Sequence, residues 1–259
     1  MKKTYPSDLT RKEWKFVKKH LPKRKNKHCL KWSWRIILNA IYYLQRTGCQ
    51  WRYLPDSFPP WKTVYHYARI WKINGFWENL NTALREMLRL REGRNQQPSA
   101  CSMDTQVSSI TAVGGLSGYN GYKSIKGRKR FTLVDTLGLL LKVKIVPGDW
   151  SETDAAMVGL EGLEQEFPRI ELLWADQGFK GWEFIAWLKG TVKWKLELTS
   201  GISKPGKPDF QVAPKRWVVE RTYAWLLRNR RLSRSHERLP EMEESLIYSC
   251  MTRLMLRRL

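Results

Sequence analysis

The chain lacks the sequence features that insert a protein into a membrane or cross-link it. No apolar run among its 259 residues approaches the ~20 residues needed to span a bilayer. Its four cysteines are scattered without a Cys-x-x-Cys pair, which excludes the usual zinc spacing and a disulfide framework. This cysteine usage favours a reducing cytoplasm. Its four histidines have no metal-binding spacing either.

Acidic residues are scarce relative to basic ones. The 24 Asp and Glu residues face 47 Lys and Arg residues, and the net charge of +23 is spread along the whole chain. This excess favours a polyanionic partner, with nucleic acid first. A membrane surface is the weaker alternative, because basic and aromatic residues do not segregate onto one amphipathic helix. A hydrophobic content of 42% is enough to bury a core, which excludes a disordered basic tail.

The first part of the chain has the periodicity of helices. Apolar residues at helical spacing predict helices over residues 11–21, 32–46, 61–74 and 76–91. Thr10 is expected as an N-cap with Glu13 as its capping-box partner, and Gly48 is expected to end the second helix. The break at Asn74 and Gly75 only weakly indicates a helix-turn-helix.

From residue 100 the pattern changes to that of a mixed α/β layout around one central sheet. Strands are predicted over residues 100–107, 130–134, 139–146, 170–175 and 192–198, and helices over residues 151–167, 182–188 and two final segments split at Pro240. Asp135 lies in the turn of a predicted hairpin and is interpreted as structural. A Gly/Pro/Lys loop is expected over residues 200–214. The polar stretch 93–99 is the best boundary between a helical domain, 1–95, and an α/β domain, 99–259.

One segment near the C-terminal end combines a carboxylate with an apolar stripe. Residues from Lys215 onwards have no Gly or Pro and are expected to be helical, with Glu220, Ala224 and Leu227 on one face. A carboxylate buried on such a face is costly unless a cation or hydrogen bonds compensate it. Arg216, one turn earlier, or a metal ion could supply that compensation. The alternative is an ordinary helix Glu in a salt bridge.

Two further acids stand at the ends of predicted strands. Asp104 lies near the end of the first strand and Asp176 follows a later one. Neighbouring strands would bring the aspartates together, and a helix packed on the sheet could deliver Glu220. Three carboxylates repel one another unless a cation such as Mg²⁺ binds their oxygens. Two ions about 3.5–4 Å apart can activate a water and stabilise the leaving oxygen of a phosphodiester. Each aspartate alone could be a turn residue, but together the acids predict phosphoryl transfer on nucleic acid.

Short segments in a fixed order carry a resemblance to a known family. The segments are residues 102–106, 118–123, 126–130, 133–138, 175–179, 216–226, 228–233 and 237–240. With them the chain resembles, over nearly its whole length, the IS5-like insertion-sequence transposases of the IS4/IS5 DDE superfamily. The resemblance implies an RNase H-like catalytic domain behind an N-terminal all-α DNA-binding domain. It also implies that Asp104, Asp176 and Glu220 are the metal-binding DDE triad.

The resemblance also implies an activity, a cofactor and partners. The enzyme would bind transposon ends, cleave DNA phosphodiesters with two Mg²⁺ ions (or Mn²⁺), and transfer the 3′-hydroxyl ends into target DNA. Its partners would be the terminal inverted repeats, the target DNA and further copies of the chain, in a homodimer or larger oligomer in the cytoplasm. A domesticated, non-catalytic DNA-binding protein and a nuclease without strand transfer are the alternatives. The three intact acids argue against the first of these.

Basic residues near the acids are the candidate DNA contacts. They are Lys123, Lys126, Arg128, Lys129 and Arg130 in one cluster, and Arg216 and Arg228 at positions −4 and +8 from Glu220. The cluster could instead be the solvated edge of a hairpin, and Arg216 could simply pair with Glu220. Of the superfamily's Tyr-Arg-Glu-Lys pattern only Arg216 and Glu220 survive, because Ala213 and Leu227 occupy the other two positions.

Overall fold

The N-terminal part of the chain forms the helices that the sequence predicts. The computed structural model describes residues 5–23, 31–199 and 215–259, so the expected loop over residues 200–214 lies outside the described residues. The helices are α1 (Arg11–His20), α2 (Trp34–Thr47), α3 (Trp61–Ile73) and α4 (Phe76–Arg91), with a short 3₁₀ turn η1 (Trp51–Tyr53) between α2 and α3. Thr10 and Glu13 form the expected capping box. Gly48 ends α2 in a left-handed conformation, φ 75°, in which its N–H donates to the Leu44 carbonyl.

The second part is built on one mixed sheet. Its strands are β1 (Ala100–Ser109), β2 (Gly118–Asn120), β3 (Ile125–Asp135), β4 (Leu140–Pro147), β5 (Leu172–Ala175) and β6 (Lys195–Leu198). β1 pairs antiparallel with β3 and parallel with β5, which pairs parallel with β6. β4 and β2 both pair with the other edge of β3. This topology places β1 and β5, the two strands expected to carry aspartates, side by side.

Asp135 has the structural role expected of it in the β3–β4 hairpin. Its carboxylate accepts hydrogen bonds from the main-chain N–H groups of Leu137 and Leu139, each at 2.9 Å. It is fully buried and forms an ion pair with Arg89 of α4 at 2.6 Å. Asp135 therefore closes the turn and fastens it to the N-terminal helices.

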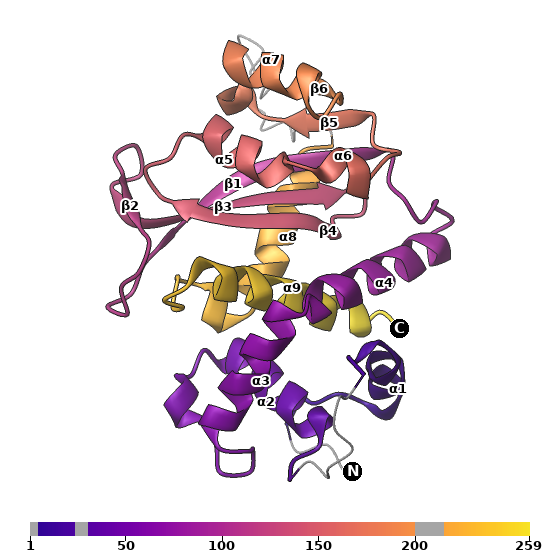
Figure 1. The fold of residues 1–259 in the computed structure, drawn as a ribbon, viewed down its shortest axis with the longest axis vertical. Helices are drawn as coiled ribbons and strands as arrows, with labels where there is room; N and C mark the ends of the chain where they lie inside the picture. Colours follow the sequence, from indigo (N-terminus) through magenta and orange to yellow (C-terminus); the bar gives the residue numbers. More distant parts are fainter. Residues whose placement is uncertain (1–4, 24–30, 200–214) are drawn as a thin grey trace, which may run out of the picture.

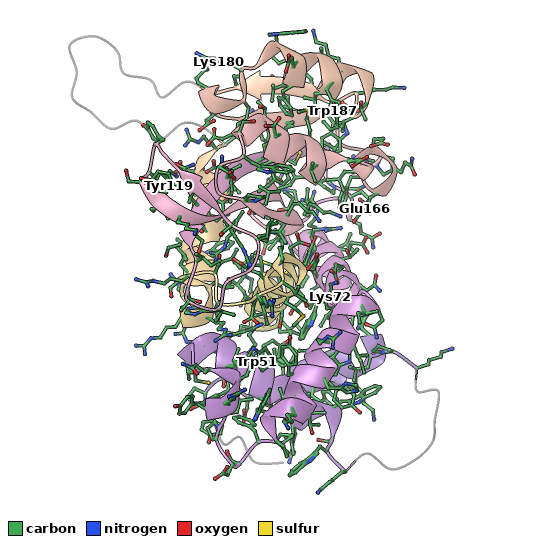
Figure 2. The ribbon with its side chains drawn as sticks, turned by 60° about the vertical axis from the view of Figure 1, so that its left-hand side comes forward. Trp51, Lys72, Tyr119, Glu166, Lys180 and Trp187 are labelled. Atoms are coloured by element: carbon green, nitrogen blue, oxygen red, sulfur yellow. The ribbon has the colours of Figure 1, made fainter. Side chains whose placement is uncertain are left out.

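Helices cover both faces of the sheet (Figure 1). One face packs against α5 (Glu152–Leu160), α6 (Leu163–Glu166) and α7 (Trp182–Gly190). The other face packs against α8 (Trp217–Leu227) and α9 (Pro240–Leu256). The N-terminal helices and α7 lie at opposite ends of the molecule, with Trp51 near one end and Trp187 near the other (Figure 2). No helix in the described ranges is both long and apolar enough to cross a bilayer.

The hydrophobic core does not divide at residues 93–99. One continuous cluster of buried residues contains Val17 of α1, Leu84 of α4, Val143 of β4 and Met251 of α9. α9 lies between the sheet and the N-terminal helices and packs on both (Figure 1). The helical part, 1–95, therefore shares its core with an element that follows it by more than a hundred residues.

Two helices are shorter than the sequence predicts, each for a local reason. The helix expected over residues 151–167 is interrupted at Gly162, whose φ of 74° lies in the left-handed region. The helix expected to run on from Lys215 ends at Leu227. There the main-chain N–H and the side-chain amide of Asn229 both donate to the Leu226 carbonyl, at 3.0 and 3.1 Å. An Asn side chain that bonds the nearby backbone in this way competes with a further helical turn.

Candidate active site

The sheet register brings the two aspartates to one edge. The parallel ladder between β1 and β5 pairs Ser102 with Trp174. Asp104 and Asp176 each lie two residues beyond that pair, in the same chain direction, so they come level with each other at the point where β5 ends. Asp104 itself lies in the middle of β1, because that strand runs on to Ser109, beyond the end expected at residue 107. The sequence-based prediction that adjacent strands would bring these two acids together is confirmed.

The helix α8 places Glu220 opposite the aspartates. Val218, Val219 and Tyr223 of α8 are buried on β3. The Tyr223 hydroxyl donates to the Asp104 carbonyl at 2.9 Å, which ties α8 to the strand carrying the first acid. Glu220 lies on the other side of α8, and its side chain is 52% exposed. The prediction of a carboxylate on a buried stripe is therefore wrong, because Ala224 and Leu227 share its exposed face.

Arg216 joins two of the three acids. Its Nη2 lies 3.1 Å from Glu220 Oε1 and 3.8 Å from Asp176 Oδ2. The pairing of Arg216 with Glu220, which the sequence offered as the alternative to a DNA contact, is present. Asp176 follows the end of β5, whereas Glu220 lies on α8. The Arg216 guanidinium therefore links the end of the strand to the helix at the site.

Asp104 is the acid whose charge is least well compensated. Burial above all, together with the negative charges of Asp176 and Glu152, raises its pKa to about 7, against the opposing effects of the Thr105 N–H and Arg216. A divalent cation would relieve this repulsion, and oxygen ligands suit Mg²⁺. The pair Asp104 and Asp176 therefore fits a metal, whereas Glu220 is held by Arg216. Within the described ranges, no three His, Cys, Asp or Glu side chains already form a metal-binding group.

A fourth carboxylate, Glu152, lies at the site and was missed by the sequence analysis. Its Oε1 accepts a hydrogen bond from the Thr105 hydroxyl at 3.1 Å. Gly178 makes room for it, because a Cβ on Gly178 would stand 1.9 Å from Glu152 Oε2. The sequence shows Glu152 only as the first residue of a capped helix. Its proximity to Asp104 depends on how α5 packs on the sheet, which no local pattern reveals.

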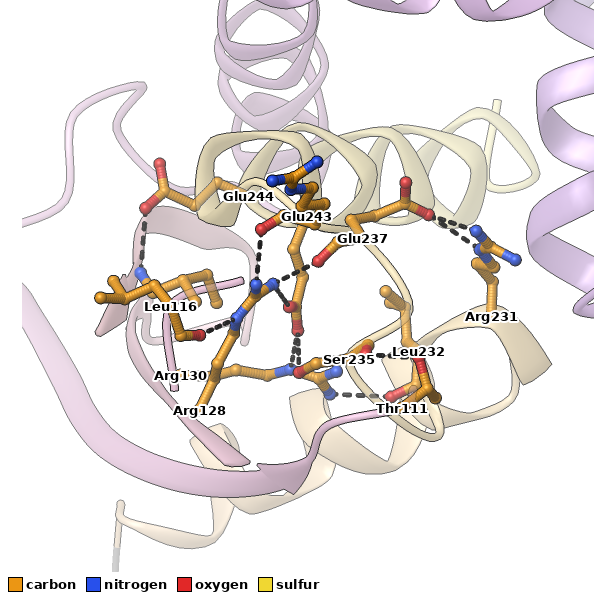
Figure 3. Close-up of polar contacts among 12 residues, drawn as sticks. Thr111, Leu116, Arg128, Arg130, Arg231, Leu232, Ser235, Glu237, Glu243 and Glu244 are labelled. Carbon is orange, nitrogen blue, oxygen red and sulfur yellow. Dashed lines mark hydrogen bonds and ion pairs between the residues drawn. The ribbon is translucent and has the colours of Figure 1, made fainter. Parts of the chain in front are cut away.

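Three of the five clustered basic residues are buried and cannot contact DNA. Arg128, Lys129 and Arg130 are 0%, 4% and 4% exposed. Arg128 and Arg130 form ion pairs with the two carboxylate oxygens of Glu243, at 3.1 and 2.8 Å (Figure 3). The prediction that these three residues bind DNA is therefore wrong. Lys123 and Lys126 are exposed and stay candidates.

Arg228 is not part of the acid cluster. It follows the end of α8 and lines a separate pocket with Arg46, Arg257 and Arg258. Of the two arginines expected beside Glu220, the structure brings only Arg216 to the acids.

Comparison with known proteins agrees with these features. The family described as "Transposase DDE domain" matches residues 95–256. A domain of unknown function attributed to transposases of the IS4/5 family matches residues 9–81. No curated protein matches the chain. One similar solved structure is described as the crystal structure of the Mos1 mariner paired end complex with Mn. It is 10% identical over 92% of this chain and 79% of that chain, with a TM-score of 0.34, which is too low to carry an argument.

Proposed function

Because this chain belongs to the DDE transposases of the IS4/5 type, we propose that it cuts DNA at the ends of its element and joins the freed 3′-hydroxyl ends to target DNA. Its α/β part has the RNase H-like fold expected for that family. The observation that carries the proposal is that Asp104 and Asp176 lie level at neighbouring strands while Arg216 joins Asp176 to Glu220.

The proposed roles of the site residues follow from their surroundings. Two Mg²⁺ ions, or Mn²⁺ in their place, would supply positive charge at the reacting phosphate when held by Asp104, Asp176 and Glu220. Arg216 neutralises Asp176 and Glu220 in the free protein, and its guanidinium can also fork two oxygens of a phosphate. Glu152 holds the Thr105 hydroxyl, which fixes the strand next to Asp104.

The proposed partner is double-stranded DNA. The net charge of +23 supplies affinity for phosphates without sequence preference. Joining two element ends to one target requires two active sites, so we propose a homodimer or larger oligomer on DNA.

Removing each acid tests the proposal. We expect Asp104→Ala, Asp176→Ala and Glu220→Ala each to abolish cleavage and to leave binding of end DNA largely intact, because phosphate contacts supply most of the affinity. The protein is incubated with Mg²⁺, a target plasmid and a plasmid that carries the DNA flanking its gene, and the products are sequenced.

The exposed Glu161→Ala is the matched control and should keep full activity. Substantial cleavage by any of the three variants would remove that residue from the site. Cut ends that are never joined to the target would instead identify a nuclease without strand transfer. Binding with no cleavage by the unaltered protein would identify a non-catalytic DNA-binding protein.

A further inference from the structure

The pocket that Arg228 lines, away from the acids, has a volume of about 260 Å³ and lies between α2, α8 and α9. Five of its eleven lining residues are arginines, and none is Asp or Glu. The arginines are Arg46, Arg228, Arg253, Arg257 and Arg258. They come from α2, from the end of α8 and from the end of α9, so the fold gathers them from three distant parts of the sequence.

Four of these five cations have no acidic partner in the parts of the chain that the structure describes. Arg253 pairs with Glu13 at 2.7 Å. No ion pair with an Asp or Glu side chain involves Arg46, Arg228, Arg257 or Arg258 in residues 5–23, 31–199 and 215–259. Burial and the positive charges of Arg253 and Arg46 lower the pKa of Arg257, with Glu13 opposing them. The free protein therefore holds like charges together, a situation that a bound anion would relieve.

Two of the arginines are held in place before any anion binds. The Arg46 guanidinium donates to the Arg228 carbonyl at 2.5 Å. The Arg258 guanidinium stacks on the ring of Trp225, with its central carbon 4.6 Å from the ring centroid. Groups that are already ordered lose less entropy on binding. All four unpaired arginines are exposed to solvent, so an incoming anion can reach them.

The position of the pocket relative to the acids indicates which anion it takes. Arg228 follows Glu220 by eight residues along α8, which corresponds to about 12 Å at 1.5 Å per residue. That length equals three to four nucleotide steps at the 3.4 Å rise of one DNA strand. A planar guanidinium fork matches the oxygens of a phosphate group.

We propose that this arginine pocket binds a backbone phosphate of the DNA undergoing cleavage, about three to four nucleotides from the scissile phosphate. The inference rests on the proposed function, because it takes Glu220 as the place where DNA is cut. The contact carries no sequence information and instead sets how the duplex lies along α8.

The first test is the salt dependence of DNA binding. The pair Arg257→Gln/Arg258→Gln is compared with Lys189→Gln/Lys193→Gln, which removes the same charge from exposed positions around the end of α7. With a random-sequence duplex and no divalent cation, the arginine pair should reduce the slope of log K against log salt by about 0.9, the contribution of the one phosphate that the pocket neutralises. The lysine pair should change the slope little. Equal slopes for the two pairs would overturn the proposal.

The second test locates the phosphate. Single methylphosphonate substitutions are placed along a duplex of the element's own terminal repeat, each removing one phosphate charge. Three to four nucleotides from the cut, we expect binding by the unaltered protein to weaken about tenfold. In Arg257→Gln/Arg258→Gln the same substitution should cost nothing further, which is the signature of a direct contact. An equal loss in both proteins at that position would overturn the proposal.

Two further readouts keep the test decisive. If the double variant fails to fold, Arg257→Gln alone replaces it in both tests. This single substitution should not disturb folding, because no hydrogen bond or ring contact is found for the Arg257 side chain within the described residues. Altered self-association with unchanged DNA affinity would mean that the pocket binds another protein chain, and would also overturn the proposal. Both tests measure binding only, so the two outcomes can be told apart. Failure of the three acidic variants to affect cleavage would refute the proposed function, and with it the position assigned to the phosphate, whereas the salt test would still show whether the pocket contacts DNA.

Discussion

Asp104 is the residue at which burial, charge and chemistry conflict most directly. Its strand must pack into the sheet, yet its carboxylate faces two other acids and is only partly offset by Arg216. In the absence of a cation its folded-state pKa of about 7 lies well above the ordinary value of 3.8. The folded protein therefore binds more protons than the unfolded chain between about pH 4 and pH 7, and loses stability as pH rises through that window.

The loss of stability with rising pH can be tested with a substitution of Asp104. Without divalent cation, Asp104→Asn should melt at a higher temperature than the unaltered protein at pH 8 and at nearly the same temperature at pH 4, because it removes the ionised carboxylate but keeps an oxygen for the Thr105 N–H. Melting is followed by calorimetry in a chelator. Adding Mg²⁺ at pH 8 should then stabilise the unaltered protein but not the variant. Identical pH profiles for the two proteins would show that Asp104 is not strained in this way.

Arg216→Lys separates the two roles of that residue. Exposed ion pairs contribute about 0–1 kcal/mol, and the Arg216 and Glu220 side chains are 25% and 52% exposed. The variant should therefore melt within a few degrees of the unaltered protein. Joining of DNA ends should nevertheless fall strongly, because lysine lacks the planar fork for a phosphate. Near-normal joining by Arg216→Lys would leave Arg216 with only the ion pair to Glu220 and Asp176.

At the residue scale, motif and strand order could predict that Asp104 and Asp176 lie close together but not which basic residues are exposed. Asp104 lies within a strand and Asp176 directly follows one, and the local patterns already indicate both strands. The burial of Arg128 and Arg130 depends on Glu243, which is more than a hundred residues away in the sequence. Glu152 reaches the site for a similarly non-local reason. The pattern of residues along the chain does not show which of these distant residues come into contact.

At the scale of elements, α9 is attached to the sheet by charge as well as by apolar contacts. Glu243 pairs with both Arg128 and Arg130 of β3, and all three side chains are at most 4% exposed (Figure 3). The Arg128 guanidinium also donates to the carbonyls of Glu237 and Arg238, which orients the segment leading into α9.

Glu243→Ala should therefore destabilise the protein by about 3–5 kcal/mol, because it leaves two buried cations without their carboxylate. The measurement is the free energy of unfolding in urea. Glu241→Ala, an exposed position two residues earlier on the same helix, should change that energy by about 0.5 kcal/mol or less. Similar losses for the two variants would contradict a special role for the network.

The sequence predicted elements best where their ends are set by local chemistry. The capping box at Thr10, the glycine after α2 and the β3–β4 hairpin all involve residues within four positions of one another. The sequence-based predictions were wrong where contacts between residues distant in the sequence determine which side of an element is buried. The apolar-looking stripe with Ala224 and Leu227 faces solvent, because Val218, Val219 and Tyr223 are the residues that fit β3.

For the whole molecule, the shared core should keep the two fragments together after proteolysis between the helical part and the α/β part. Residues 92–96 are exposed, so a protease should nick the protein there, as the polar composition predicts. The two pieces should nevertheless elute together in gel filtration, because α9 packs into the core of the N-terminal helices. They should separate only in denaturant. Immediate dissociation after the nick would show that the two parts are independent domains.

The place of α9 in that core also has a consequence in time. During synthesis the first 95 residues leave the ribosome well before the residues of α9, which end at Leu256. At 5–20 residues per second the delay is roughly 8–32 s. Throughout that interval the apolar surface of the early helices that α9 covers has no partner. A message broken anywhere before Pro240 would therefore yield a chain whose early helices also lack part of their core.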